Sequence, residues 1–131
     1  MKLPVCTIDI QVRYSDTDAM GHLSNEAYLT YLQQGRLALF EEIRKQTGWA
    51  QPIVMASTSA DFVQECFYGD HLSVTTWCEH KGTKSLTLYG EVFANGTLVS
   101  RGRATHVGFD KQTRTSVPLP EHWEASDVPA R

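Results

Sequence analysis

A single segment with helical periodicity is the feature that most restricts how this chain can fold. From residue 25 onward apolar side chains recur every three or four positions, until Gly48 and Pro52 supply a stop signal. Ser24 or Asn25 can cap the start of this segment. We therefore expect one helix of about 20 residues, about 30 Å long. No other part of the sequence shows a helical period of this length.

Five β-rich segments accompany the helix. The first, residues 7–14, alternates apolar and polar side chains with the period of two that is typical of a half-buried strand. Four more follow Pro52 and are separated by turn sequences, namely residues 53–63, 71–80, 85–93 and 97–109. Asn95-Gly96 is typical of a type I′ turn, so we expect the last two strands to pair antiparallel.

With only one helix available, the sheet has to curl around it to bury an apolar face. The expected fold is α+β, a five-stranded antiparallel sheet wrapped around one long central helix. Gly35, in the middle of the helix, costs about 1 kcal/mol relative to alanine, which indicates a close backbone approach there. The proline-containing tail from Val117 is expected to lie on the surface and to add little to the core. We expect residues 1–131 to form one domain.

Composition excludes several functional classes. Twelve Lys and Arg against fifteen Asp and Glu give a net charge of −3, which argues against a nucleic-acid partner. The three cysteines are far apart and lack a CxxC pair, as expected for a cytoplasmic protein without a disulfide framework. No apolar run approaches the roughly 18 residues of a membrane span, so membrane insertion is not expected.

The loop before the helix contains the only dense cluster of reactive side chains. Asp16, Asp18, His22 and Asn25 lie within ten residues of one another, just before a helix start. A helix start offers unpaired N–H groups that can polarise a carbonyl, and a nearby carboxylate can act as a base or a nucleophile on the same carbon.

Simpler roles for the same residues stay open. The aspartates can shape turns, Asn25 can cap the helix and His22 can be a surface residue. Metal binding by Asp16, Asp18 and His22 has no second ligand cluster to support it, and we expect no metal or cofactor. The sequence also lacks the GxSxG elbow of serine hydrolases and the glycine-rich loops that bind nucleotides.

The run RYSDTDAMGHLSNEAYLTYLQQGRLALF resembles the first third of hotdog-fold acyl-CoA thioesterases of the 4-hydroxybenzoyl-CoA thioesterase branch. The later segment FVQECFYGDHLSV is similar to the same family, with its aromatic residue, its Gly-Asp turn and the leucine and valine that follow. The resemblance covers residues 7–109. It implies a hotdog fold and dimers that join two sheets, with active sites at the subunit interface, and we expect a homodimer that assembles further into a homotetramer.

The resemblance also implies roles for individual residues. Asp18 would be the catalytic carboxylate, the backbone N–H near Asn25 would polarise the thioester carbonyl, and Gly21 would help the loop to fold back. His22 and Tyr28 are expected to contact substrate. The turn KGTKS is similar to a loop that in many relatives lies against coenzyme A, and it supplies the expected binding residues Lys81, Gly82, Lys84 and Ser85.

The expected reaction is hydrolysis of the thioester of a small or medium acyl-CoA, or of an acyl carrier protein, to free acid and thiol. Lys81 and Lys84, with Arg101 and Arg103, would compensate the phosphates of coenzyme A. Two alternatives stay open. A related hydratase or dehydratase would use a histidine and a carboxylate, although the HFPG-like signature of such enzymes is missing. A non-catalytic acyl-CoA binding protein could use the same fold.

Overall fold

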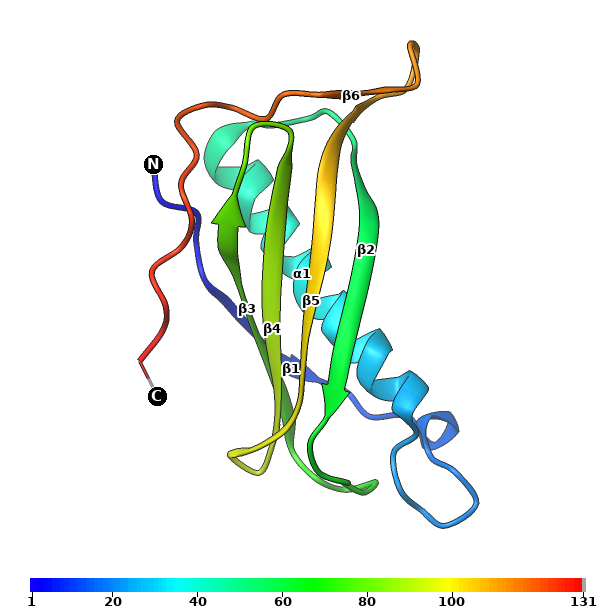
Figure 1. The fold of residues 1–131 in the computed structure, drawn as a ribbon. Helices are drawn as coiled ribbons and strands as arrows, with labels where there is room; N and C mark the ends of the chain where they lie inside the picture. The colour runs from blue at the N-terminus through cyan, green and yellow to red at the C-terminus, as the bar shows by residue number, and fades with distance from the viewer. Residues whose placement is uncertain (131) are drawn as a thin grey trace.

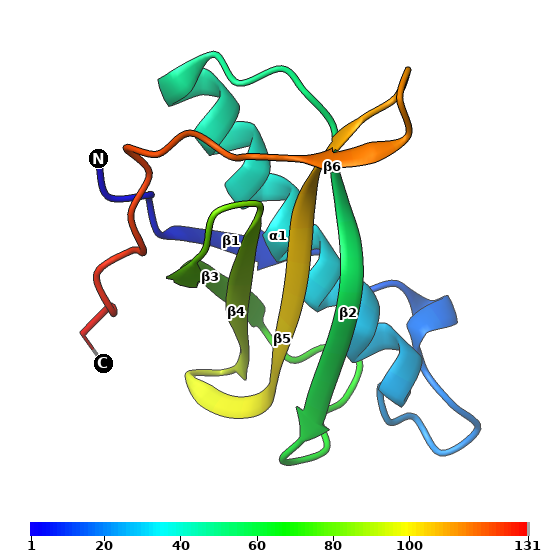
Figure 2. The same cartoon turned by 45° about the horizontal axis from the view of Figure 1, so that its top comes forward.

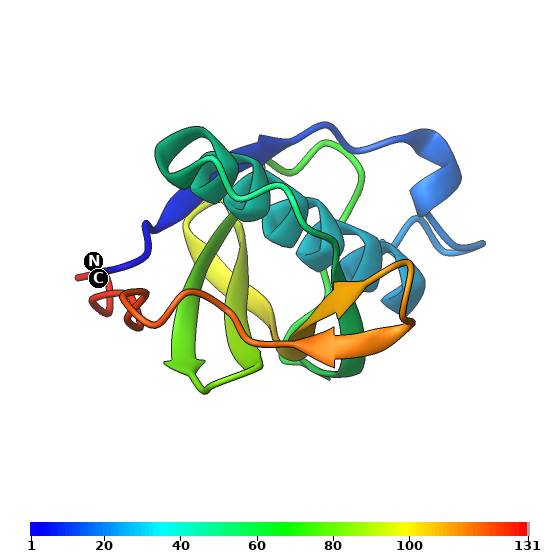
Figure 3. The ribbon, with the colours of Figure 1, turned by 90° about the horizontal axis from the view of Figure 1, so that it is seen from above.

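The computed structural model describes residues 1–130, in which one long helix lies inside a curled antiparallel sheet (Figure 1; seen from above in Figure 3). The elements are β1 (Cys6–Ile10), the 3-10 turn η1 (Tyr14–Asp16), α1 (Asn25–Thr47), β2 (Ile53–Phe62), β3 (Leu72–Lys81), β4 (Ser85–Ala94), β5 (Thr97–Asp110) and β6 (Thr115–Val117). The strand order is β1-β3-β4-β5-β2, and β6 pairs with the end of β5. The predicted architecture is confirmed, with one short strand added.

Local interactions determine both ends of helix α1. The hydroxyl of Ser24 accepts a hydrogen bond from the backbone N–H of Ala27 at 3.2 Å, so Ser24 rather than Asn25 is the N-cap. At the other end Gly48 adopts a left-handed conformation with φ of 72°, which suits a residue without a Cβ.

The four strands after the helix lie within one residue of their predicted bounds. Asn95 and Gly96 both have positive φ, 51° and 84°, and close the two-residue turn between β4 and β5. The first prediction was wrong in length, because β1 stops at Ile10 instead of continuing to Tyr14. The side chain of Asp16 accepts a hydrogen bond from the backbone N–H of Arg13 and so favours the turn η1 over a longer strand.

Gly35 marks a close approach of the helix to the sheet, as predicted. A Cβ at this position would lie 2.7 Å from Cγ1 of Val74 and would also meet the hydroxyl of Thr76. Both neighbours belong to β3, so the absence of a side chain lets helix and strand pack directly against each other.

The core has two clusters, one toward each end of the helix. The first packs Leu23, Tyr28 and Leu32 of the α1 side against Leu72 and Val92 of the sheet. The second lies around Leu39, Phe40 and Ile43 near the end of α1. Within residues 1–130 no helix is both long and apolar enough to cross a membrane.

The C-terminal tail is part of the second cluster, and the expectation that it adds little to the core was wrong. Leu119 and Trp123 are each only 2% exposed, and the Trp123 ring contacts Trp49 edge to face at 5.4 Å between centroids. Backbone hydrogen bonds from Leu119 to Thr83 and from Ser126 to Cys78 fix the tail across the sheet (orange and red in Figure 2). A tail rich in proline can pack against a core because it needs few backbone partners.

Candidate active site

Residues 17–24 form a narrow loop that leads from η1 into α1. Its two sides meet in a bridge between Thr17 and Leu23, and the N–H of Asp18 donates to the carbonyl of His22 at 2.8 Å. Gly21, at the tip, has a φ of 82°, in the left-handed region that favours glycine. The loop therefore turns back on itself and returns the chain to the helix start.

Asp16 anchors this loop from the protein side. Its carboxylate is 6% exposed and accepts hydrogen bonds from the Tyr31 hydroxyl at 2.7 Å and from the Arg13 backbone and guanidinium at 3.0 Å each. Burial by itself raises the pKa of Asp16, but these hydrogen bonds, with the backbone N–H of Arg13 foremost, outweigh it and hold the pKa below its ordinary 3.8. Asp16 therefore fixes the loop in place.

Asp18 points to the opposite side and is 45% exposed. Its Oδ1 accepts hydrogen bonds from the backbone N–H groups of Met20 at 2.8 Å and His22 at 3.1 Å. Its Oδ2 accepts no hydrogen bond from residues 1–130 and has the His22 Nδ1 at 3.9 Å. One oxygen thus shapes the turn, as the simpler role required, while the other remains available for chemistry.

His22 lies between two carboxylates. Its Nε2 is 3.3 Å from Oε2 of Glu65, on the side away from Asp18, and its ring packs edge to face against Phe67 at 4.8 Å. Glu65 was not among the predicted site residues. The sole signal for it was its place inside the segment FVQECFYGDHLSV, because no local pattern indicates that this segment returns to the loop.

The start of α1 lies beside Asp18. Ser24 caps the N–H of Ala27, whereas the N–H groups of Asn25 and Glu26 find no acceptor in the described part of the chain. Unpaired N–H groups at a helix start attract negative charge and can stabilise an oxyanion.

These groups surround a cleft of about 630 Å³. Its wall combines the loop, the first turn of α1 and the end of β2, and is lined by Asp18, His22, Leu23, Ser24, Asn25, Glu26, Tyr28, Phe62, Val63, Gln64 and Glu65. Four predicted site residues, Asp18, His22, Asn25 and Tyr28, are thus brought together, and Gly21 lies at the tip of the loop that carries Asp18. Within the described residues no three Asp, Glu, His or Cys side chains are placed to hold a metal ion.

Tyr28 forms the floor of the cleft. Its hydroxyl donates to the backbone carbonyl of Gln64 at 3.0 Å and lies 3.2 Å from the Cys66 sulfur. Burial, with the contact to Cys66, raises the pKa of Tyr28 well above 10, so the phenol stays neutral. Tyr28 is only 2% exposed, so it supports the wall of the cleft from the core side and offers a ligand little direct contact.

The predicted coenzyme A turn is not near this cleft in the same chain. Lys81, Gly82, Lys84 and Ser85 lie at the β3–β4 turn, at the opposite end of the sheet from the loop (Figure 1). Strand β3 separates the two places and spans about 30 Å. One chain alone therefore cannot use Asp18 and this turn on the same thioester.

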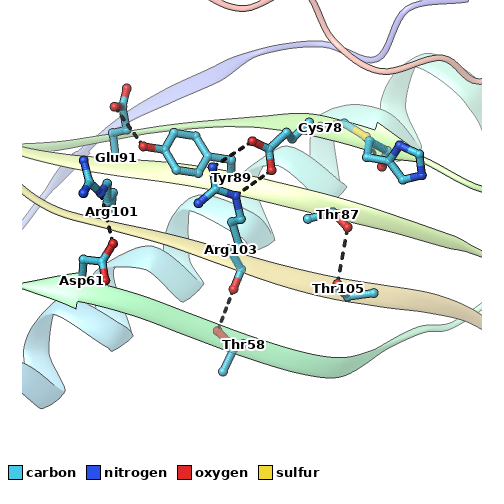
Figure 4. Close-up of polar contacts among 11 residues, drawn as sticks. Thr58, Asp61, Cys78, Thr87, Tyr89, Glu91, Arg101, Arg103 and Thr105 are labelled. Atoms are coloured by element: carbon cyan, nitrogen blue, oxygen red, sulfur yellow. Dashed lines mark hydrogen bonds and ion pairs between the residues drawn. The ribbon is translucent and has the colours of Figure 1, made fainter.

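The two arginines expected to compensate phosphate are already paired on the outer face of the sheet (Figure 4). Arg101 contacts Asp61 at 3.1 Å, and Arg103 makes two hydrogen bonds to Glu79 at 2.8 and 2.9 Å. Paired guanidinium groups on this face leave the lysines of the β3–β4 turn as the better candidates for a phosphate contact.

The pairing of a carboxylate with an open helix start, in a sheet curled around one helix, can be compared with known proteins. The family model described as the thioesterase-like superfamily matches residues 12–126. The chain belongs to this superfamily. The predicted hotdog fold and the predicted activity of a thioester hydrolase are thereby confirmed.

Individual proteins are similar to this chain along most of its length. YneP of Bacillus subtilis (strain 168), assigned as an acyl-CoA thioesterase, is 31% identical over 114 residues, which cover 80% of each protein. A predicted thioesterase from Bacillus stearothermophilus is 29% identical and superposes with a TM-score of 0.80 over 90% of both chains. A thioesterase from Thermus thermophilus complexed with coenzyme A and Zn is 26% identical, with a TM-score of 0.76 over 91% of this chain and 93% of that one.

Proposed function

We propose that the cleft hydrolyses the thioester of an acyl-CoA, with Asp18 as the catalytic carboxylate. The observation that carries the proposal is the shared wall of the cleft, which is lined by Asp18, with one carboxylate oxygen that accepts no hydrogen bond from residues 1–130, and by Asn25 and Glu26 at the open helix start. The superfamily and the coenzyme A complex of the Thermus thermophilus relative support coenzyme A as the carrier.

The reaction can be followed from these groups. The helix start polarises the thioester carbonyl and holds the oxyanion that forms when a nucleophile adds to the carbon. Asp18 either accepts a proton from the attacking water or attacks the carbon itself. When water is the nucleophile, the C–S bond then breaks, the thiolate of coenzyme A leaves with the proton that Asp18 accepted, and the acyl group departs as a free acid. When Asp18 is the nucleophile, breaking the C–S bond leaves an acyl-Asp18 anhydride, and water then hydrolyses this anhydride to the free acid and restores the carboxylate.

Replacing Asp18 by asparagine tests this assignment. The amide keeps the shape of the turn and loses the base, so we expect kcat for thiol release to fall at least about a hundredfold. The matched control is Asp61→Asn, which removes a carboxylate on the outer face and should leave kcat within about twofold. Equal turnover by Asp18→Asn and the wild type, across several acyl-CoAs, contradicts the role of Asp18.

A second copy of the chain can complete the site. Strand β2 is an edge strand, and its partly apolar surface includes the exposed side chains Val54, Met55 and Phe62, with the exposed Val63 directly after it. Edges of this kind readily accept another strand. Antiparallel pairing of two β2 strands about a two-fold axis would continue the sheet into a homodimer.

Such a dimer also resolves the separation of Asp18 from the predicted coenzyme A turn. Antiparallel pairing sets the Ile53 end of one copy beside the Phe62 end of the other, where the cleft lies. In each copy Val107 pairs with both Val54 and Ser85, so the β3–β4 turn lies at the Ile53 end. The partner copy's Lys81 and Lys84 then approach this copy's cleft and can bind the phosphates of coenzyme A.

A further inference from the structure

A second cavity lies between α1 and β2, further along both elements than the cleft. It has a volume of about 200 Å³ and is lined by Leu29, Thr30, Gln33, Arg36, Met55 and Thr58. Along α1 these residues follow directly after Tyr28, and along β2 they precede Phe62, so the second cavity lies next to the cleft on the side away from Asp18. Arg36 lies about 16 Å from Asn25 along the helix.

The guanidinium of Arg36 is the unusual feature of this second cavity. The side chain is partly buried, and no carboxylate among residues 1–130 lies within 4.0 Å of it. The hydrogen-bond contact that its guanidinium makes within the described residues is to the sulfur of Met55 at 3.9 Å, and a thioether is a weak acceptor. Burial lowers the pKa of Arg36, but an arginine keeps its charge.

The neighbouring histidine does not balance this charge. His106 is buried on β5, its ring packs against Phe40, and neither ring nitrogen has a hydrogen-bond partner within the described residues. Burial, together with the positive charge of Arg36, lowers the pKa of His106 to about 4, so this imidazole is neutral at neutral pH. A partly desolvated cation without a counter-ion is unfavourable unless an anion binds it.

We propose that Arg36 binds a carboxylate at the far end of the acyl chain, with Thr30 and Gln33 as polar neighbours, so that the enzyme selects ω-carboxyacyl thioesters. This inference rests on the proposed function, because it places the thioester of the same substrate beside Asp18. The planar guanidinium can hold a carboxylate with two parallel hydrogen bonds, and the apolar side chains of Leu29 and Met55 can accommodate the methylene chain.

Thiol release from paired substrates tests the inference. Each ω-carboxyacyl-CoA is compared with the unsubstituted acyl-CoA of the same chain length, over a series of lengths. The wild type should show a higher kcat/KM for the carboxylated member at one length, where the carboxylate reaches Arg36. In Arg36→Met this substrate should lose about tenfold to a hundredfold in kcat/KM, as expected for a charged hydrogen bond, while the unsubstituted partner keeps its value.

Two controls separate this effect from others. Arg44→Met removes a cation from the exposed last turn of the same helix and should leave the selectivity unchanged. Titration calorimetry with non-hydrolysable thioether analogues of the same esters measures binding without turnover, so it detects the Arg36 contact even if the hydrolytic assignment fails. The carboxylated analogue should bind about tenfold more tightly than its partner to the wild type, and both should bind equally to Arg36→Met.

Three results would overturn the inference. The wild type could show no preference for a carboxylated ester at any length, in turnover or in binding. Arg36→Met could weaken both members of each pair equally. Arg36→Met could also sediment as a monomer where the wild type sediments as a dimer, in which case the guanidinium binds a second copy of the chain instead of substrate.

Discussion

At the scale of single residues, Asp16 and Asp18 show how neighbouring identical side chains acquire different tasks. Asp16 is buried and hydrogen-bonded to Tyr31 and Arg13, whereas Asp18 faces the cleft. The sequence S-D-T-D contains both aspartates, and its pattern does not indicate which of them is buried. Side chains alternate between two faces only within a strand, and this segment is not a strand. The resemblance to a family singled out Asp18, and the role of Asp16 required the fold.

Asp16→Asn should destabilise the protein by about 1–3 kcal/mol at pH 7, because it weakens buried hydrogen bonds to a charged acceptor. The folded state depresses the pKa of Asp16 below 3.8, so its stabilisation is present above that value and is lost as the pH falls through the lower folded pKa. Urea unfolding at pH 7 and near pH 3 measures both effects.

The difference between wild type and Asp16→Asn should therefore shrink on acidification. Asp9→Asn, at an exposed position on β1, serves as the control and should change the free energy of unfolding by less than about 0.5 kcal/mol. A difference that is the same at both pH values would mean that the Asp16 carboxylate contributes through its shape alone.

At the scale of elements, most of the fold could be predicted because period and turn chemistry act locally. Helix α1 and the four strands after it were placed to within a few residues by apolar spacing, Gly48 and Asn95-Gly96. The first strand was overestimated because a side chain from Asp16 reaches back to Arg13, which alternation does not reveal. Glu65 was not predicted as a site residue for a related reason, since only the folded chain brings it next to His22.

Gly35→Ala tests how tightly the helix packs on β3. The added methyl would lie 2.7 Å from Val74, and both neighbours are buried in a packed layer, so we expect a loss of about 1–3 kcal/mol despite the better helix propensity of alanine. Gln34→Ala, on the exposed side of the same turn, provides the control and should not destabilise. The measurement is the denaturant midpoint of unfolding for each variant. Equal midpoints would show that β3 can shift to accommodate the added methyl group.

At the scale of the whole molecule, the proposed dimer divides each site between two chains, which a mixing experiment can detect. Asp18→Asn lacks the carboxylate, and Lys81→Glu/Lys84→Glu lacks the phosphate contact. Each variant alone should have low kcat/KM. After subunit exchange, half of the dimers are mixed, and one of their two sites combines both intact parts, so about a quarter of all sites should be active.

Native mass spectrometry confirms that the exchange has occurred and supplies the fraction of mixed dimers. Activity that stays at the level of the separate variants, in a sample containing mixed dimers, would show that the β3–β4 turn does not serve the partner's cleft. The sequence could not show which cleft the turn serves. It gives neither the distance from the turn to the cleft of the same chain nor the distance to the cleft of a partner chain.

The two clusters of the core have a practical consequence for engineering heat tolerance. The cluster around Leu23 and Tyr28 shapes the cleft, and repacking it would alter catalysis and stability together. The cluster closed by Leu119 and Trp123 contributes no residue to the cleft wall. Leu119 and Trp123 themselves lie beside Lys81, Gly82 and Thr83 of the β3–β4 turn and should be kept. A library restricted to the other members of that distal cluster can therefore raise the melting temperature while the reaction centre keeps its present form, and rounds of selection there should seldom lower turnover.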